Sequence, residues 1–196
     1  YMLSNYSVDK DKVGIFGYSI VPPAWNQAYV DWWHRRHNLD IDPESLVFST
    51  GVVPAISSMV RKLTTANENV LIQTPVYNIF NSIINNGCRV LESPLEYDGS
   101  GHYSINWADL ESKLADPQTT LMILCNPHNP VGRIWDRDTL ARIGELCWNH
   151  HVTVISDEIH CDLTDPGYDY VPFASVNEQC AMNSVTCMAP TKTFHI

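Results

Sequence analysis

Short runs of apolar and β-branched residues recur along the chain, and loops or stretches with helical spacing separate them. Runs of this length, apolar on both faces, are typical of buried β-strands. We therefore predict six strands, over Leu46–Ser49, Val70–Gln73, Arg89–Glu92, Thr120–Cys125, Val152–Ser156 and Val185–Met188.

Between these runs, apolar positions three and four residues apart predict helices over Ala24–His37, Pro54–Leu63, Trp107–Leu114 and Asp138–His150. The polar segment Tyr97–Tyr103 contains two glycines and is expected to form a surface turn. Strands that alternate with helices, and that are apolar on both faces, indicate an α/β protein with three layers and a mostly parallel sheet.

Composition adds bounds on size and partners. With 196 residues, 44% of them hydrophobic, the chain can bury a substantial core, and we expect one domain. A formal net charge of -10 argues against nucleic acid or an anionic membrane as partner. No apolar run approaches the roughly 20 residues of a membrane span, so we expect a soluble, cytoplasmic protein.

Six cysteines occur singly, without C-x-x-C spacing, and we expect them to be free, buried thiols. The sequence lacks an initial methionine and ends shortly after Lys192. On this basis we expect a fragment of a longer protein.

In an open α/β sheet, ligands bind beyond the carboxyl ends of the strands. The first predicted strand is followed by Gly51, Val52 and Val53, where a turn enters a helix whose free N–H groups suit a phosphate. Taken alone this signal is weak, because a glycine between a strand and a helix is ordinary. Tyr77 follows the second strand and could stack on a planar ligand or simply pack against the protein.

Two further strand exits carry polar groups. Asn126–Gly132 contains two Asn-Pro pairs, which indicate a stiff loop that presents amide side chains, although such a loop could merely end the strand. Asp157 follows a buried strand and requires a cation or donors to remain ionised. A protonated pyridine nitrogen would serve, and the alternative is that Asp157 caps the next helix.

The last predicted strand leads to Lys192, in an otherwise uncharged segment. A partly desolvated lysine has a lowered pKa and can form a Schiff base, whereas a plain surface lysine is the competing interpretation. His150, His151, His160 and Cys161 lack the spacing of a metal site, and we predict none. The phosphate turn, the aromatic ring, the amide loop, the acid and the lysine should all lie at one edge of the sheet.

These residues occur in the order found in fold-type I enzymes that use pyridoxal 5′-phosphate (PLP), in the class I/II aminotransferase superfamily. The segments IFGYS, TGVVPAI, PVYNIF, ILCNPHNPVGR, VISDEIHCDL and APTKTF most resemble the cystathionine β-lyase-like C–S lyases. The resemblance implies a PLP-dependent transferase-like large domain over residues 1–196 with a mixed seven-stranded sheet. It also implies a homodimer with active sites at the interface, and a small C-terminal domain and an N-terminal segment outside this chain.

The resemblance also implies a role for each site residue. Lys192 should carry PLP and later act as the base at the substrate Cα, and Asp157 should pair with the pyridine nitrogen. The remaining roles are stacking by Tyr77, contact of Asn126 and His160 with the 3-oxygen of the ring, phosphate binding by Val52, Val53 and Thr191, and completion of the neighbouring subunit's site by Tyr18.

Two departures from the family pattern bear on activity. Ala189 stands where aminotransferases often carry serine, which favours the lyase branch. The arginine expected to bind the substrate carboxylate lies outside this chain. The resemblance thus implies cleavage of cystathionine or cysteine S-conjugates to a thiol, pyruvate and ammonia. Alternatives are a PLP-dependent aminotransferase and a PLP-binding regulatory protein that contacts a transcription activator.

Overall fold

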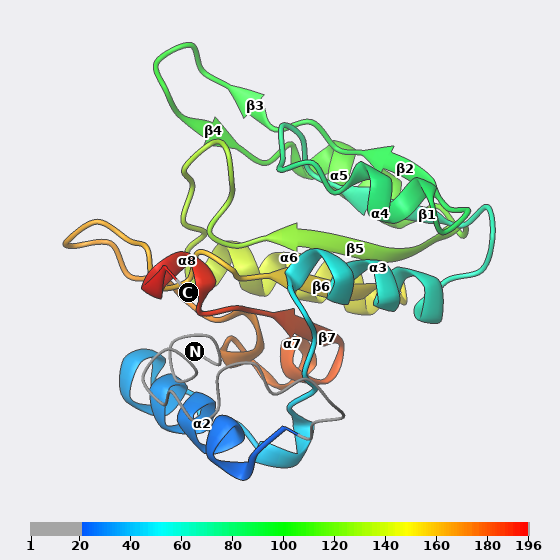
Figure 1. Ribbon diagram of the computed structural model, residues 1–196. Helices are drawn as coiled ribbons and strands as arrows, with labels where there is room; N and C mark the ends of the chain where they lie inside the picture. The colour runs from blue at the N-terminus through cyan, green and yellow to red at the C-terminus, as the bar shows by residue number, and fades with distance from the viewer. Residues whose placement is uncertain (1–20, 196) are drawn as a thin grey trace. The chain divides into compact units, whose positions relative to one another are not determined.

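The computed structural model describes residues 21–195. The chain divides into two compact units, one formed by Tyr1–Phe48 with Ala189–Ile196 and the other by Ser49–Met188. Each unit has its own secondary structure, and the larger one contains the sheet (Figure 1).

The larger unit is built on five parallel strands in the order β2-β1-β5-β6-β7. Their bounds are Asn69–Ile72 (β1), Arg89–Glu92 (β2), Thr119–Cys125 (β5), Thr153–Asp157 (β6) and Ser184–Cys187 (β7). β5 and β6 lie in the middle, and their apolar side chains are almost fully buried. The sheet therefore needs helices on both faces, as the apolar runs predict.

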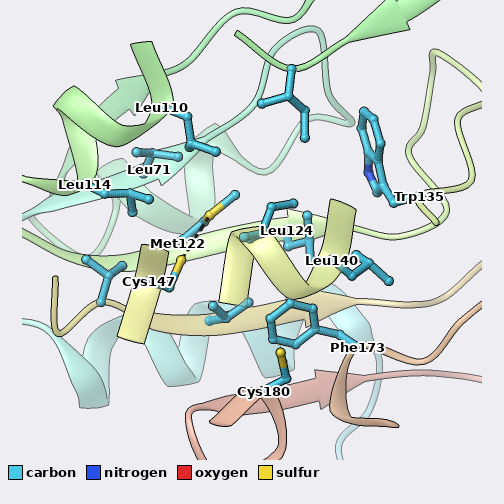
Figure 2. Close-up of a cluster of buried hydrophobic side chains, with 14 of the residues drawn as sticks. Leu71, Leu110, Leu114, Met122, Leu124, Trp135, Leu140, Cys147, Phe173 and Cys180 are labelled. Atoms are coloured by element: carbon cyan, nitrogen blue, oxygen red, sulfur yellow. Dashed lines mark hydrogen bonds between the residues drawn. The ribbon is translucent and has the colours of Figure 1, made fainter. Parts of the chain in front are cut away.

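Helices cover the two faces of this sheet (Figure 1). α3 (Val52–Leu63) and α4 (Phe80–Ile84) contact each other on one face, and α5 (Trp107–Leu114) and α6 (Arg137–Asn149) contact each other on the opposite face. Side chains of β1, β5 and β6 that point toward α5 and α6 form the main core. Figure 2 shows Met122, Leu124, Leu140 and Phe173 in this core.

Local sequence signals set the helix ends. The side chain of Asp136 accepts a hydrogen bond from the backbone N–H of Thr139 at 2.8 Å and so caps α6. The side chain of Asn106 caps α5 in the same way through the N–H of Asp109. The first turn of each helix thereby has a partner for one of its free N–H groups.

The remaining elements of the larger unit are short. β3 (Glu96–Tyr97) and β4 (Tyr103–Ser104) form an antiparallel hairpin, where the sequence predicts a surface turn. A 3-10 helix, η2 (Phe173–Ser175), and α7 (Glu178–Met182) precede β7. α7 packs on α6, and Phe173 and Cys180 close the lower end of the core (Figure 2).

The smaller unit contains α2 (Pro23–His37), a 3-10 helix η1 (Pro43–Ser45), and α8 (Thr191–Phe194). α2 ends at Asn38, which has a left-handed backbone with φ 50°. The ring of Phe194 meets the ring of Trp32 edge to face, with centroids 5.2 Å apart. This contact holds α8, which carries Lys192, against α2.

Five of the six predicted strands and all four predicted helices are confirmed, with ends that shift by at most two residues. The strand predicted over Leu46–Ser49 is wrong. This segment pairs with no strand among the described residues, and the Val47 side chain is 87% exposed. Val47 is β-branched and Phe48 is aromatic, which favours a strand, but a strand also requires hydrogen-bonding neighbours.

The described residues form a parallel sheet of five strands and a separate hairpin, not the mixed seven-stranded sheet that the resemblance implies. The fold class is nevertheless confirmed as α/β with a mostly parallel sheet. No helix in residues 21–195 is both long enough and apolar enough to span a bilayer.

Candidate active site

Asp157 is the last residue of β6 and is 7% exposed. In the sheet register it lies between Cys125 of β5 and Cys187 of β7. Its carboxylate accepts a hydrogen bond from the backbone N–H of Ile159 at 3.3 Å. Turns rather than a helix follow Asp157, so the alternative role as a helix cap is wrong. The carboxylate closes a turn at the carboxyl end of β6, an interior strand of the sheet.

The two thiols beside Asp157, those of Cys125 and Cys187, are buried. Burial, with the nearby charge of Asp157, raises the pKa values of Cys125 and Cys187 to about 12. Both thiols therefore stay protonated at neutral pH. They form a neutral, weakly polar surround for the one carboxylate between them.

The loop after β5 is held at several points. His128 is buried, with Nε2 2.9 Å from the carbonyl oxygen of Pro75, and burial lowers the pKa of its imidazole. The indole N–H of Trp135 donates to the carbonyl of Cys125 at 3.2 Å. The backbone N–H of Tyr77 donates to the carbonyl of Asn129 at 2.9 Å. These contacts connect the exits of β1 and β5 through the loop. The two Asn-Pro pairs predict a stiff loop here, but they do not predict this connection.

Asn126 is fully buried, and its surroundings differ from those of Asp157. Its Nδ2 donates to the carbonyl of Val171 at 3.0 Å, and the same side chain also interacts with the carboxyl group of Glu158 and lowers its pKa. Its Oδ1 has no hydrogen-bond partner among the described residues. The two amide hydrogens thus face protein acceptors, and the atom left over is itself an acceptor.

Three further predicted residues belong to the larger unit: Tyr77 lies in the loop after β1, and Val52 and Val53 begin α3. Tyr77 is 50% exposed, which leaves its ring accessible. The residue after Val53 is Pro54, which has no N–H. The first turn of α3 therefore offers the N–H groups of Val52 and Val53. Gly51 has φ 164°, an extended backbone that any residue adopts, so its turn does not require glycine.

The other predicted residues fall elsewhere. His160 is half-buried in the turn after Asp157. Thr191 and Lys192 are exposed residues of α8 and belong to the smaller unit. Tyr18 lies outside the described residues. The structure thus brings Asp157, Asn126 and the Tyr77 segment to one sheet edge in the larger unit, while Lys192 is placed on its own short helix.

Sequence reasoning missed two residues of this region. Glu158 is fully buried and carries four hydrogen bonds from neighbouring groups. Asn129, the second amide of the loop, is half-buried next to the Tyr77 segment. The available signals were a second acid directly after Asp157 and a second Asn-Pro pair, but neither indicates which way its side chain points.

Comparison with known proteins defines the class first. The fold is that of the PLP-dependent transferases: the structure of cystalysin from Treponema denticola, which contains a pyridoxal 5′-phosphate cofactor, superposes with a TM-score of 0.93 at 34% identity, covering 100% of this chain and 49% of that one.

Sequence comparison then gives the family. The family model for aminotransferase class I and II matches residues 4–191, and the chain belongs to this family. It is 49% identical over 185 residues to cystathionine beta-lyase PatB of Bacillus subtilis, covering 93% of this chain and 47% of that protein. It is 34% identical over 169 residues to protein MalY of Escherichia coli, covering 83% and 42%. The chain spans about half the length of these curated relatives.

Proposed function

We propose that this chain is the cofactor-binding part of a PLP-dependent C–S β-lyase that cleaves cystathionine or a related cysteine S-conjugate to a thiol, pyruvate and ammonia. The observation that carries the proposal is the buried carboxylate of Asp157 at the carboxyl end of β6, an interior strand of the sheet, in a chain 49% identical to a cystathionine beta-lyase.

The residues of the larger unit fit the cofactor chemically. A carboxylate buried between two neutral thiols favours a cationic partner, and a protonated pyridine nitrogen is such a cation. When bound, PLP supplies an electron sink for the charge left at the substrate Cα. Asp157 would hold the proton on the pyridine nitrogen and so maintain that capacity.

The phosphate of the cofactor needs donors and positive potential. The N–H groups of Val52 and Val53 open a helix of three turns, whose N-terminus attracts anions. The hydroxyl of Thr191 is the third proposed donor. Tyr77, with its accessible ring, would stack on the pyridine.

The amide that faces the 3-oxygen of the ring is better assigned to Asn129 than to Asn126. An oxygen anion needs a hydrogen-bond donor, and the Asn126 amide directs its hydrogens to Val171 and Glu158. Asn129 follows the same strand exit and lies beside the Tyr77 segment. His160 stays in its proposed role as a second contact of that oxygen.

Lys192 would carry out the proton transfers. Its amine would bind the cofactor in the resting protein and, once the substrate amine displaces it, would remove the proton from Cα. The Cβ–S bond then breaks and the thiolate leaves. Addition of water to the remaining three-carbon fragment gives pyruvate and ammonia. We further propose a homodimer in which Tyr18 completes the partner's site.

Pyruvate formation tests this function. The full-length protein, loaded with PLP, should release pyruvate from cystathionine without an added keto acid, whereas a transaminase needs an acceptor. Lys192→Ala should lower kcat by at least about a thousandfold, because it removes the base. Lys62→Ala, at an exposed position near the end of α3, is the matched control and should retain full activity. Transfer of the amino group of cystathionine to an added keto acid, without release of a thiol and pyruvate, would replace lyase by aminotransferase.

A further inference from the structure

Glu158 is a buried carboxyl group to which the proposed chemistry gives no task. It is fully buried and directly follows Asp157. Its Oε1 accepts hydrogen bonds from the hydroxyl of Ser156 at 2.7 Å and from the backbone N–H of Phe173 at 3.0 Å. Its Oε2 accepts from the hydroxyl of Tyr170. Burial of a carboxyl group costs free energy, and these hydrogen-bond donors offset part of that cost. Such a set of donors indicates a structural role for the side chain.

Two of the donors, Tyr170 and Phe173, come from the far end of the irregular segment that follows Glu158. Residues 159–172 contain turns but no helix or strand, and they connect the end of β6 to η2. Glu158 thus joins the beginning of the segment to its end. A segment without regular hydrogen bonds relies on such contacts to keep one conformation.

The same carboxyl also reaches the exit of β5. Asn126 bonds to both Val171 and Glu158 through its side chain, and its backbone N–H donates to the carbonyl of Asp157 at 2.9 Å. The peptide group after Asp157 is therefore held from one side by Asn126. Movement of Asn126 would be transmitted to the backbone that carries the Asp157 carboxylate.

Strand alternation separates the two acids. Val154 belongs to the core against α5 and α6, so Ser156, two residues later, points to that same face. Glu158 bonds to Ser156 and lies on this face, while Asp157 points to the opposite one. Glu158 therefore supports the strand end from the face opposite to the Asp157 side chain.

Burial, partly offset by these hydrogen bonds, raises the pKa of Glu158 to about 7. Burial beside Glu158 raises the pKa of Tyr170 well above its usual value, so the phenol stays a donor. Removal of the carboxyl would take away the acceptor that the Ser156 and Tyr170 hydroxyls and the Phe173 N–H share in a buried region.

We propose that Glu158 is a positioning residue that closes the segment Ile159–Pro172 onto the exits of β5 and β6 and so fixes the backbone at Asp157. The closure of the segment stands on the contacts alone, and the benefit for cofactor binding rests on the proposed function. Glu158 itself touches neither cofactor nor substrate.

Hydrogen exchange of the cofactor-free, full-length protein tests the closure. Glu158→Ala should raise the exchange rates of peptides covering 159–173 and Asn126 by at least about tenfold. Glu158→Gln keeps the shape and the oxygen acceptor and should stay within about threefold of the wild type. Leu114→Ala is the matched control, because it destabilises the core through α5, away from this segment, and should not raise exchange there selectively. Equal exchange in Glu158→Ala and Leu114→Ala would overturn the proposal.

PLP affinity tests the second part and separates it from the proposed function. Glu158→Ala should weaken PLP binding at least about tenfold, with Glu158→Gln and Leu114→Ala close to the wild type. If Glu158→Ala does not fold, Tyr170→Phe removes one of its donors and should shift exchange and affinity in the same direction, by about threefold. Tight PLP binding by these variants would overturn the role at Asp157. Failure of the wild type to bind PLP would instead refute the proposed function and leave the exchange result to be judged by itself.

Discussion

Two adjacent acids at the end of β6 face different surroundings, and that difference decides their chemistry. Asp157 lies between neutral thiols and accepts a backbone N–H, whereas Glu158 is enclosed by hydroxyl and amide donors on the other face. Asp157 is suited to bind a cation, and Glu158 is suited to connect the end of β6 to Tyr170 and Phe173. Neighbours in the sequence thus serve the site in different ways.

The raised pKa of Glu158 predicts a pH-dependent contribution to stability. Between the unfolded value of 4.5 and the folded value of about 7, the folded state keeps a proton that the unfolded state has lost. This contribution is therefore complete below pH 4.5 and is lost as the pH rises through 7. Glutamine does not titrate, so the stability of the wild type relative to Glu158→Gln should fall by about 3 kcal/mol between pH 4.5 and pH 8.

Urea unfolding of both proteins across this pH range measures the difference directly. Taking the difference between the two unfolding free energies removes the contributions of ionisable groups that both proteins share. The shared groups around Glu158 are Asp157, Cys161, Asp162, Tyr170 and Cys187. A difference that stays constant with pH would show that Glu158 is ionised throughout, and the burial argument would then fail.

The burial of the six cysteine thiols predicts slow chemical modification in the folded protein. All are free and buried, and burial raises the pKa values of Cys125, Cys147, Cys161, Cys180 and Cys187. Because the thiolate is the reactive form, alkylation by iodoacetamide at pH 7.5 should be at least about a hundredfold slower in the native protein than in urea. Peptide mapping by mass gives the rate at each cysteine. Fast native labelling of any of these five would contradict the burial.

The positions of candidate residues that directly follow a strand could be predicted from the sequence, but the side-chain hydrogen bonds of these residues could not. Asp157, Asn126 and Tyr77 could be placed at one edge because each follows an apolar run. The direction of the Asn126 amide depends on Val171 and Glu158, which lie 45 and 32 positions further along the sequence. No local pattern specifies such a distant partner.

At the scale of elements, periodicity predicted α5 and β2 with the observed ends. The segment Leu46–Ser49 was predicted wrongly because its residue types favour strands while the fold offers no neighbour for it among the described residues. The hydrogen bonds of a helix lie within one segment, so its pattern can be recognised from that segment alone, whereas a strand bonds to a neighbour elsewhere in the chain.

The contact of α6 with α7 gives a prediction at this scale. A Cβ added to Gly144 would overlap the sulfur of Cys180 and lie 3.5 Å from Phe173. Gly144→Ala should therefore destabilise the protein by about 1–3 kcal/mol, although alanine is the better helix former. Cys180→Ala should remove most of this penalty in the double variant, since it takes away the overlapping atom.

Urea unfolding of the single and double variants measures that coupling. Glu145→Ala, at the exposed neighbouring position of α6, serves as the control for helix propensity and should change stability by less than about 0.5 kcal/mol. Additive effects of Gly144→Ala and Cys180→Ala would contradict close packing of α7 on α6.

At the scale of the whole molecule, the chain spans about half the length of its curated relatives. The larger unit contributes Asp157, the amide loop and the start of α3, and the smaller unit contributes Thr191 and Lys192. The residues that we propose for cofactor binding are therefore found in both units.

Shared sites in a homodimer predict complementation. Tyr18→Phe and Lys192→Ala should each be strongly impaired as homodimers, but a hybrid dimer has one site with both native residues. Unfolded and refolded together in equal amounts, half of the dimers should be hybrids, and lyase activity should reach about one quarter of the wild type. Activity that stays at the level of the separate variants would place Tyr18 in its own subunit's site or outside any site.

The central claim is that this chain binds PLP through Lys192. The most direct test is borohydride reduction of the PLP-loaded, full-length protein, which makes a bond between a lysine amine and the cofactor permanent, followed by peptide mass analysis. We predict the cofactor mass on the peptide that contains Lys192, and its loss in Lys192→Ala. Cofactor mass on another lysine, or on none, in the folded full-length protein would contradict the claim.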